Sequence, residues 1–323
     1  MRSLKVQYSN VSVIAPARLH MGFIDLSGAL GRHFGSIGVA LNEINTRLTI
    51  RPASHLTVTG KSASRAEKCA RKLCMALNLP DSFSIEVEAS IPEHVGLGSG
   101  TQMSLAVGMG LNHYFGLDLT VRDIARLTDR GMRSGIGIGV FERGGLVVDG
   151  GRGERTVTPP VLAHMQIPDD WRFILAFDKR GQGLHGKQEV QAFEALPPFP
   201  QQEAARLCYL LMMQGLPAVA EHDIVRFGEV VTQLQRSVGE HFAPAQGGIF
   251  TSPEVAEAMI WLEAQGCVAI GQTSWGPTGF CALLGAEQAE AMTEQTRRQF
   301  SHHPHLSFVT VGVSNSGGQV SAV

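Results

Sequence analysis

The chain has 323 residues, of which 44% are hydrophobic, so it can form one large domain or two ordinary domains with sizeable cores. Its 27 Lys and Arg residues nearly balance its 29 Asp and Glu residues, which argues against a nucleic-acid partner, since such proteins need a basic face. No apolar run approaches the ~18 residues of a membrane span, and the N-terminal residues do not resemble a signal peptide. Five cysteines without a CxxC pair are typical of a reduced, cytoplasmic protein.

In the first half of the chain, runs of Val, Ile and Leu predict strands, and apolar residues that recur every three or four positions predict helices. Strands are expected at 11–19, 47–50, 83–89 and, with a glycine turn, 145–153. Helices are expected at 62–78, from the glycines at 96–100 to about Phe115, and at 120–135. Thr120 is a good N-cap for the last of these helices, because Asp123 follows three residues later.

Residues 156–170 contain several prolines and have no clear period, so we expect them to connect two domains, 1–155 and 156–323. Beyond them, strands are expected at 171–178, 267–272, 279–285 and 306–314. Helices are expected at 187–196, 201–215, 218–240, 252–266 and 286–300. Because strands and helices are mixed in both halves, the pattern predicts an α+β fold with two layered units side by side.

The strongest local signal is the stretch PEHVGLGSGTQMSLA at 92–106, a glycine-rich loop that opens onto an apolar helix. Glycine lets the backbone approach a ligand closely, and a helix start offers unpaired N–H groups and a partial positive charge. The pattern therefore favours an anion site, although a plain tight turn is the alternative. The residues of this expected site are Gly96, Gly98, Ser99, Gly100 and Thr101.

The stretch DKRGQGLHGKQEV at 178–190 places four potential cations, Lys179, Arg180, His185 and Lys187, around one glycine-rich turn. Gln188 stands where a phosphate-binding P-loop needs Ser or Thr, so a P-loop NTPase is disfavoured. A phosphate or carboxylate ligand suits such a turn. The alternative is a solvated basic turn.

A third stretch, 15–41, sets Arg18, His20, Asp25, Arg32 and His33 among apolar residues and glycines. Charged groups in such surroundings are rarely buried unless they are paired. One interpretation is a strip of acid/base and anion-binding groups. The other is a structural pair of Arg18 and Asp25.

Two further patterns are weaker. GQTSWGPTGF at 271–280 is a glycine turn between two expected strands, either a simple hairpin loop or part of a site. His302, His303 and His305 lie close together, but no acidic residue is spaced to complete a zinc site, so we expect a solvated loop. The glycines at 135–139 are not followed by the acidic residue of a dinucleotide-binding motif.

Taken together, these stretches resemble the GHMP kinase superfamily over essentially the whole chain. PARLHMGFIDLSG at 16–28 is similar to its first motif, 92–106 to its second, and 271–280 lies where its third is found. The resemblance implies an N-terminal domain like the second domain of ribosomal protein S5 and a ferredoxin-like C-terminal domain. The active site is then expected between the two.

The chain departs from the kinase pattern in two places. Kinases of this superfamily usually carry the pattern SGxxD, and here Ile138 stands at the position of the aspartate. An isoleucine cannot accept a proton from a substrate hydroxyl. The third motif contains Trp275 and Pro277 in place of small residues. Both departures argue against ordinary phosphoryl transfer from ATP.

One branch of the superfamily is more similar, the β-ribofuranosylaminobenzene 5′-phosphate synthases of tetrahydromethanopterin biosynthesis. The similar stretches are 18–32, 135–151 and GLHGKQE at 183–189. The resemblance implies a phosphoribosyltransferase that joins 5-phosphoribosyl-1-pyrophosphate (PRPP) to 4-aminobenzoate or 4-hydroxybenzoate with loss of CO2 and pyrophosphate. It also implies Mg²⁺ as cofactor and a homodimer.

In this interpretation the 96–100 loop holds pyrophosphate, helped by the hydroxyls of Ser99 and Thr101. Asp25 stabilises the positive charge at the ribose or acts as base, with His20 as the alternative base, and Arg18 or Arg32 grips a carboxylate or the 5′-phosphate. Further phosphate contacts are expected from His185, Lys187 and Ser274. The rival hypotheses are an ATP-dependent small-molecule kinase and a non-catalytic regulator of the same fold that binds a phosphorylated metabolite.

Overall fold

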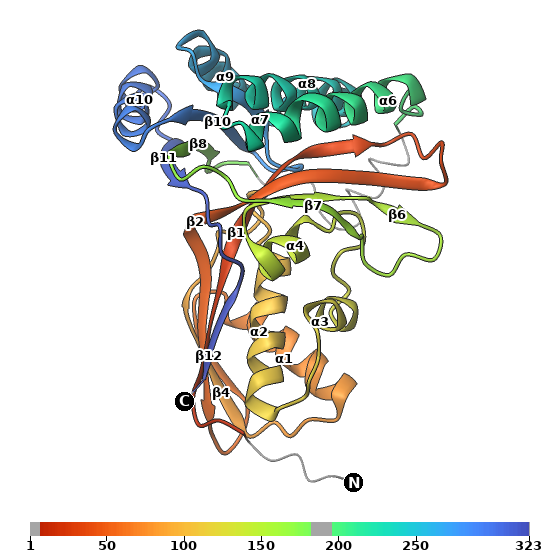
Figure 1. The fold of residues 1–323 in the computed structure, drawn as a ribbon. Helices are drawn as coiled ribbons and strands as arrows, with labels where there is room; N and C mark the ends of the chain where they lie inside the picture. The colour runs from red at the N-terminus through yellow and green to blue at the C-terminus, as the bar shows by residue number, and fades with distance from the viewer. Residues whose placement is uncertain (1–6, 182–195, 323) are drawn as a thin grey trace.

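Residues 7–181 and 196–322 are described by a computed structural model, in which two sheets organise the chain (Figure 1). The larger sheet contains the path β12-β1-β2-β4-β3, with β5, β6 and β7 attached through β2 and β5. The smaller sheet has the order β11-β8-β10-β9. None of the described helices has the length and apolar character needed to span a membrane.

The larger sheet is built on a long hairpin of β1 (Val11–Asp25) and β2 (Arg32–Pro52). Both strands extend well beyond the expected 11–19 and 47–50. Glycines and charged residues interrupt the apolar pattern there, and two register shifts in β1 break its alternation. Cross-strand pairing supplies what the local pattern lacks, since β2 pairs with β5 (Leu146–Asp149) near its start and with β4 (Phe83–Ala89) near its end.

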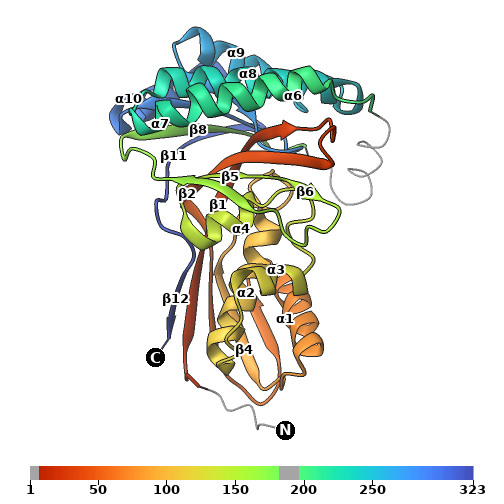
Figure 2. The same ribbon diagram turned by 45° about the vertical axis from the view of Figure 1, so that its right-hand side comes forward.

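Four helices cover one face of this sheet (Figures 1 and 2). They are α1 (Ala63–Leu77), α2 (Ser99–Phe115), α3 (Val121–Leu127) and α4 (Ile136–Arg143). The predicted capping box of Thr120 and Asp123 starts α3. This helix ends eight residues earlier than expected, because Asp129 and Gly131 adopt positive φ angles that a helix cannot contain. The turn that follows is therefore free to face the start of α2.

The expected linker at 156–170 is not a simple connection. It contains β7 (Val161–Met165), which pairs antiparallel with β5 and so belongs to the larger sheet. Short strands β3 (Thr57–Gly60) and β6 (Arg152–Gly153) complete the sheet, together with β12 (Gln319–Ala322), which pairs with β1. The sheet thus contains strands from both sides of the expected boundary at 155/156, because β7 pairs with β5 and β12 pairs with β1.

The smaller sheet consists of β8 (Trp171–Asp178), β9 (Val268–Gln272), β10 (Thr278–Leu284) and β11 (Leu306–Gly312). Numbered within this unit, its antiparallel strands run in the order 4-1-3-2, which is the ferredoxin-like arrangement expected. Helices α9 (Pro253–Ala264) and α10 (Ala286–Gln299) pack against it. The start of α9 agrees with the helix expected at 252–266, and Ser252 caps it with a hydroxyl that accepts a bond from the N–H of Val255.

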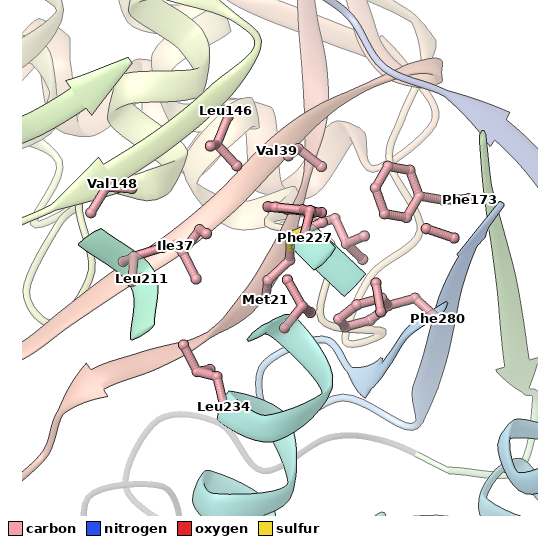
Figure 3. Packing of buried hydrophobic residues seen from close by; sticks show 14 of the residues in the cluster. Met21, Ile37, Val39, Leu146, Val148, Phe173, Leu211, Phe227, Leu234 and Phe280 are labelled. Carbon is pink, nitrogen blue, oxygen red and sulfur yellow. The ribbon is translucent and has the colours of Figure 1, made fainter. Parts of the chain in front are cut away.

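A further group of helices packs against both the smaller sheet and β1, and lies at the top of Figure 2. It runs through α6 (Gln201–Leu210), a π turn η1 (Leu211–Gly215), α7 (Leu216–Ala220) and α8 (Ile224–Gln246). The expected helix at 187–196 falls almost wholly outside the described residues. A shared core joins this group to both sheets, with labelled side chains from seven elements meeting in Figure 3. The two halves are therefore held together by buried apolar contacts.

Candidate active site

A cleft of about 740 Å³ lies where the two halves meet. Its walls are the 96–100 loop with the start of α2, one face of α1, the turn at 128–134, and residues 274–276 between β9 and β10. Arg18 and His20, near the middle of β1, also line the cleft. Segments that are far apart in sequence are thus brought together around one hollow.

The glycine loop is shaped by close backbone contacts. Gly96 and Gly98 have φ angles of 82° and 79°, which glycine adopts without strain. A Cβ on Gly96 would lie 2.3 Å from the carbonyl oxygen of Thr273, so only glycine allows this approach. The Thr273 hydroxyl donates to the Gly96 oxygen at 2.8 Å and accepts from the His20 N–H at 3.0 Å. The second and third motifs are therefore locked onto β1.

Arg18 follows the inner side of the same loop. Its guanidinium donates to the carbonyl oxygen of Gly96, and its backbone N–H donates to Leu97. A Cβ on Gly98 would come within 2.8 Å of the Arg18 side chain. The arginine predicted to contact an anion thus lies beside the predicted anion loop, and both line the cleft.

Among the described residues, five further cations line the cleft, and none of them was expected from the motifs. They are Arg65, Lys68 and Lys72 on α1, and Arg130 and Arg133 in the turn after α3. The spacing of three and four in RAEKCARK was a usable signal, since it puts basic residues on one helix face. The helix was predicted from its apolar positions alone, so its basic face was missed.

The charges in the cleft are mainly positive. Arg65 donates to the Ser99 hydroxyl at 3.1 Å and pairs with Glu93 at 2.8 Å, while Lys72 pairs with Asp129. Arg130 is mostly buried, and desolvation, with the nearby charge of Arg65, lowers the pKa of its guanidinium. An arginine stays charged despite such a shift. A cleft of this kind attracts anions with several charges.

His20 is completely buried at the inner end of the cleft. Desolvation, and next the charge of Arg18, hold the pKa of its imidazole well below the usual 6.5, so it is neutral at pH 7. Its Nδ1 accepts a bond from the N–H of Gly22 at 3.3 Å, which assigns the proton to Nε2. Within the described part of the chain, Nε2 has no hydrogen-bond partner.

Asp25 and Arg32 do not join this group. Neither is among the described residues that line the cleft. Asp25 lies at the far end of β1, about 20 Å from Arg18 along an extended strand, and accepts bonds from the N–H and hydroxyl of Ser27. Arg32 donates to the carbonyls of Gly150 and Gly151. The strip of charged groups expected at 15–41 is therefore divided, and its spacing does not support an Arg18–Asp25 pair.

The basic turn after β8 has a structural partner. Arg180 bridges Asp178 at 2.9 Å and Glu254 at 2.7 Å. Although burial opposes it, this bonding holds the pKa of Asp178 well below its usual range. His185 and Lys187 lie outside the described residues.

The histidine loop at 302–305 has an acidic neighbour that the sequence spacing did not indicate. Glu254, from the first turn of α9, lies 3.8 Å from the His305 Nε2, and its carboxylate and the rings of His303 and His305 gather within 4.8 Å. Sequence spacing could not reveal this, since some fifty residues separate the two segments. The same carboxylate oxygen of Glu254 is held by Arg180, so the cluster is tied to the ion-pair network of β8.

The position of the missing kinase aspartate is closed. Ile138 lies in the first turn of α4, is 1% exposed and shares a buried core cluster with apolar residues of α2. A model of the GHMP kinases N terminal domain matches residues 64–142, and one of the GHMP kinases C terminal domain matches 216–302. A β-ribofuranosylphenol 5′-phosphate synthase of Archaeoglobus fulgidus is 37% identical over 68% of this chain and 74% of its own length. The chain belongs to the GHMP kinase family.

Further relatives and solved structures are similar over most of the chain. The synthase of the same name from Methanothermobacter thermautotrophicus is 31% identical over 81% of this chain and 85% of its own. A 4-diphosphocytidyl-2-C-methyl-D-erythritol kinase from a Synechococcus strain is 27% identical over 90% of both chains. Among solved structures, mevalonate diphosphate decarboxylase from Staphylococcus aureus superposes with a TM-score of 0.67 at 15% identity and 98% coverage of both chains, which confirms the GHMP fold.

Proposed function

We propose that this GHMP protein is a decarboxylating phosphoribosyltransferase, which joins PRPP to 4-hydroxybenzoate or 4-aminobenzoate and gives a C-riboside 5′-phosphate, CO2 and pyrophosphate. Its place is then in tetrahydromethanopterin biosynthesis. The observation that carries the proposal is a cleft rich in cations in a chain whose kinase aspartate is replaced by buried Ile138. Its similarity to two synthases whose product is a ribosylated phenol supports the same reaction.

The bonds made and broken define what the cleft must do. The C1–O bond of PRPP breaks, and its electron pair leaves with pyrophosphate. The ring carbon that carries the carboxylate forms the new bond to C1. The bond to the carboxylate then breaks, its electrons restore the aromatic ring, and CO2 departs. Because the carboxylate leaves as CO2, the ring carbon needs no base.

The residues of the cleft suit the first of these steps. A leaving pyrophosphate gains negative charge as the C1–O bond breaks, and fixed positive groups stabilise that charge. Arg65, Lys68 and Arg130 lie around the start of α2, whose N–H groups add a favourable dipole. Arg18, at the loop itself, is placed to hold a phosphate or the benzoate carboxylate.

The expected Mg²⁺ fits the cleft less well. Magnesium prefers carboxylate, water and phosphate oxygens. Among the described lining residues, Asp129 is the carboxylate on offer, and it pairs with Lys72. The protein thus supplies positive charge directly, and we expect any magnesium to be bound by the phosphates of the substrate. No step of the mechanism is assigned to it.

The test is release of CO2 from carboxyl-labelled 4-hydroxybenzoate and 4-aminobenzoate, with PRPP and Mg²⁺ and, separately, with ATP and Mg²⁺. We expect release that depends on PRPP and none with ATP. Formation of ADP without CO2 release would support the rival kinase hypothesis. Tight PRPP binding without any turnover would support the non-catalytic regulator.

A further inference from the structure

A small cavity of about 20 Å³ adjoins the inner end of the cleft, and no step of the proposed reaction described above uses it. His20, Phe23, Ser274 and Trp275 line both hollows. A volume of this size holds one group as large as a water molecule. The cavity is therefore too small for a ring but large enough for a single polar substituent of a ring that lies in the cleft.

Aromatic side chains surround the junction of the two hollows. The rings of Phe242 and Trp275 lie 4.2 Å apart between centroids, those of Phe23 and Phe242 lie 6.4 Å apart, and His20 meets Phe23 edge-on at 4.9 Å. These separations are typical of favourable aromatic packing. A planar aromatic ligand can add to such a group from the cleft side, because the largely buried Phe23 and Trp275 are among the residues that line the cleft.

Three glutamines form the polar part of the small cavity, and each is already engaged. Gln235 donates to the Met21 carbonyl and accepts from the Gln272 N–H at 2.8 Å. Gln272 accepts from the N–H of Thr251, and Gln246 donates to the carbonyls of Gly248 and Ile249. In contrast, the Nε2–H of His20 has no acceptor among the described residues. A buried donor of this kind is costly unless a ligand or water satisfies it.

We infer that the benzoate ring lies at the inner end of the cleft against Phe23 and Trp275, with its para substituent in the small cavity as acceptor for the Nε2–H of His20. The inference rests on the proposed function and names its aromatic subsite. It directs the carboxylate-bearing carbon, at the opposite end of the ring, back towards the cationic cleft where the ribose must lie. A phenol oxygen is a good acceptor, whereas an aniline nitrogen shares its lone pair with the ring. The subsite therefore favours 4-hydroxybenzoate.

The test compares equilibrium binding of 4-hydroxybenzoate and unsubstituted benzoate to the wild-type protein and to His20→Phe, which keeps a ring of similar size. We expect the wild type to prefer 4-hydroxybenzoate by about threefold to tenfold, as one hydrogen bond provides. His20→Phe should bind both acids equally and bind pyrophosphate as the wild type does. A merely structural role of His20 would not change this ratio.

Trp275→Phe provides a second and independent variant. It should weaken both acids about threefold or more while keeping their ratio, whereas the matched control Trp261→Phe, whose indole packs on Phe300 away from the cleft, should change neither. If the wild type releases CO2 with PRPP but His20→Phe keeps the preference for 4-hydroxybenzoate, the subsite is wrong and the proposed function stands. If the wild type turns over neither acid, the proposed function fails and the subsite with it.

Discussion

Arg65 gives the sharpest test of the cationic cleft, because the same helix carries a matched control. Arg65 faces the cleft and donates to Ser99 at the start of α2, while Arg71 is exposed and pairs with Glu67 four residues away. A hydrogen bond that involves a charged group contributes about 1.5–3 kcal/mol, which corresponds to a change of about 10- to 150-fold in a dissociation constant. An exposed pair contributes at most about 1 kcal/mol, and only to stability.

We therefore expect Arg65→Met to weaken inorganic pyrophosphate by about 10- to 150-fold and Arg71→Met by less than about twofold. Isothermal titration calorimetry at fixed ionic strength measures both constants, and thermal melting confirms that both variants fold. Glu93→Gln removes the acidic partner of Arg65 and should tighten pyrophosphate binding. Equal loss of affinity in the two arginine variants would refute the assignment of the α1 face to the anion site.

Three further outcomes follow from the geometry. Gly96→Ala should lower the free energy of unfolding, measured by urea titration, by about 2 kcal/mol more than Gly247→Ala. Both glycines have positive φ, but only at Gly96 would a Cβ meet the Thr273 carbonyl. Equal losses would show that this contact has no energetic cost. Because the pKa of His20 is depressed, the unfolded chain binds a proton below pH 6.5 that the folded chain does not, so the free energy of unfolding falls as pH falls. His20→Phe should remove up to about 1.4 kcal/mol per pH unit of this slope between pH 6 and 5. An unchanged slope would contradict a buried, neutral His20. Ile138→Asp should lower the melting temperature by burying an unpaired carboxyl and should yield no ADP from ATP, whereas gain of phosphoryl transfer would revive the kinase hypothesis.

Local patterns predicted the elements whose signals lie within one segment. The strand expected at 83–89 is β4, and the helix expected at 252–266 is α9, which begins after Ser252. The long hairpin was underestimated because the first part of β2 is stabilised by pairing with β1 and, at 36–39, with β5, and the local sequence does not show these partners. The strand at 161–165 was missed for the same reason.

The site was predicted to a similar degree. The loop at 96–100, Arg18, His20 and Ser274 do line one cleft, because these residues lie in motifs or next to them. The basic face of α1 and Arg130 were missed, since their sequence alone does not show that they lie opposite the 96–100 loop. Asp25 was grouped with Arg18 because the expected strand ended at residue 19, whereas β1 continues to Asp25 and carries it about 20 Å away along the strand.

β1 is synthesised early and its partner β12 late, so the larger sheet is incomplete during most of synthesis at the ribosome. Without β12, β1 is the outer strand of the sheet and exposes its backbone N–H and C=O groups. Chains grow at roughly 5–20 residues per second, so tens of seconds pass between the emergence of β1 and that of its partner. During that time the nascent sheet carries an open edge able to recruit a strand from another chain. Expression at high levels should therefore favour aggregation of chains truncated before Gln319, and an attending chaperone that covers the open edge until β12 emerges should protect the full-length chain.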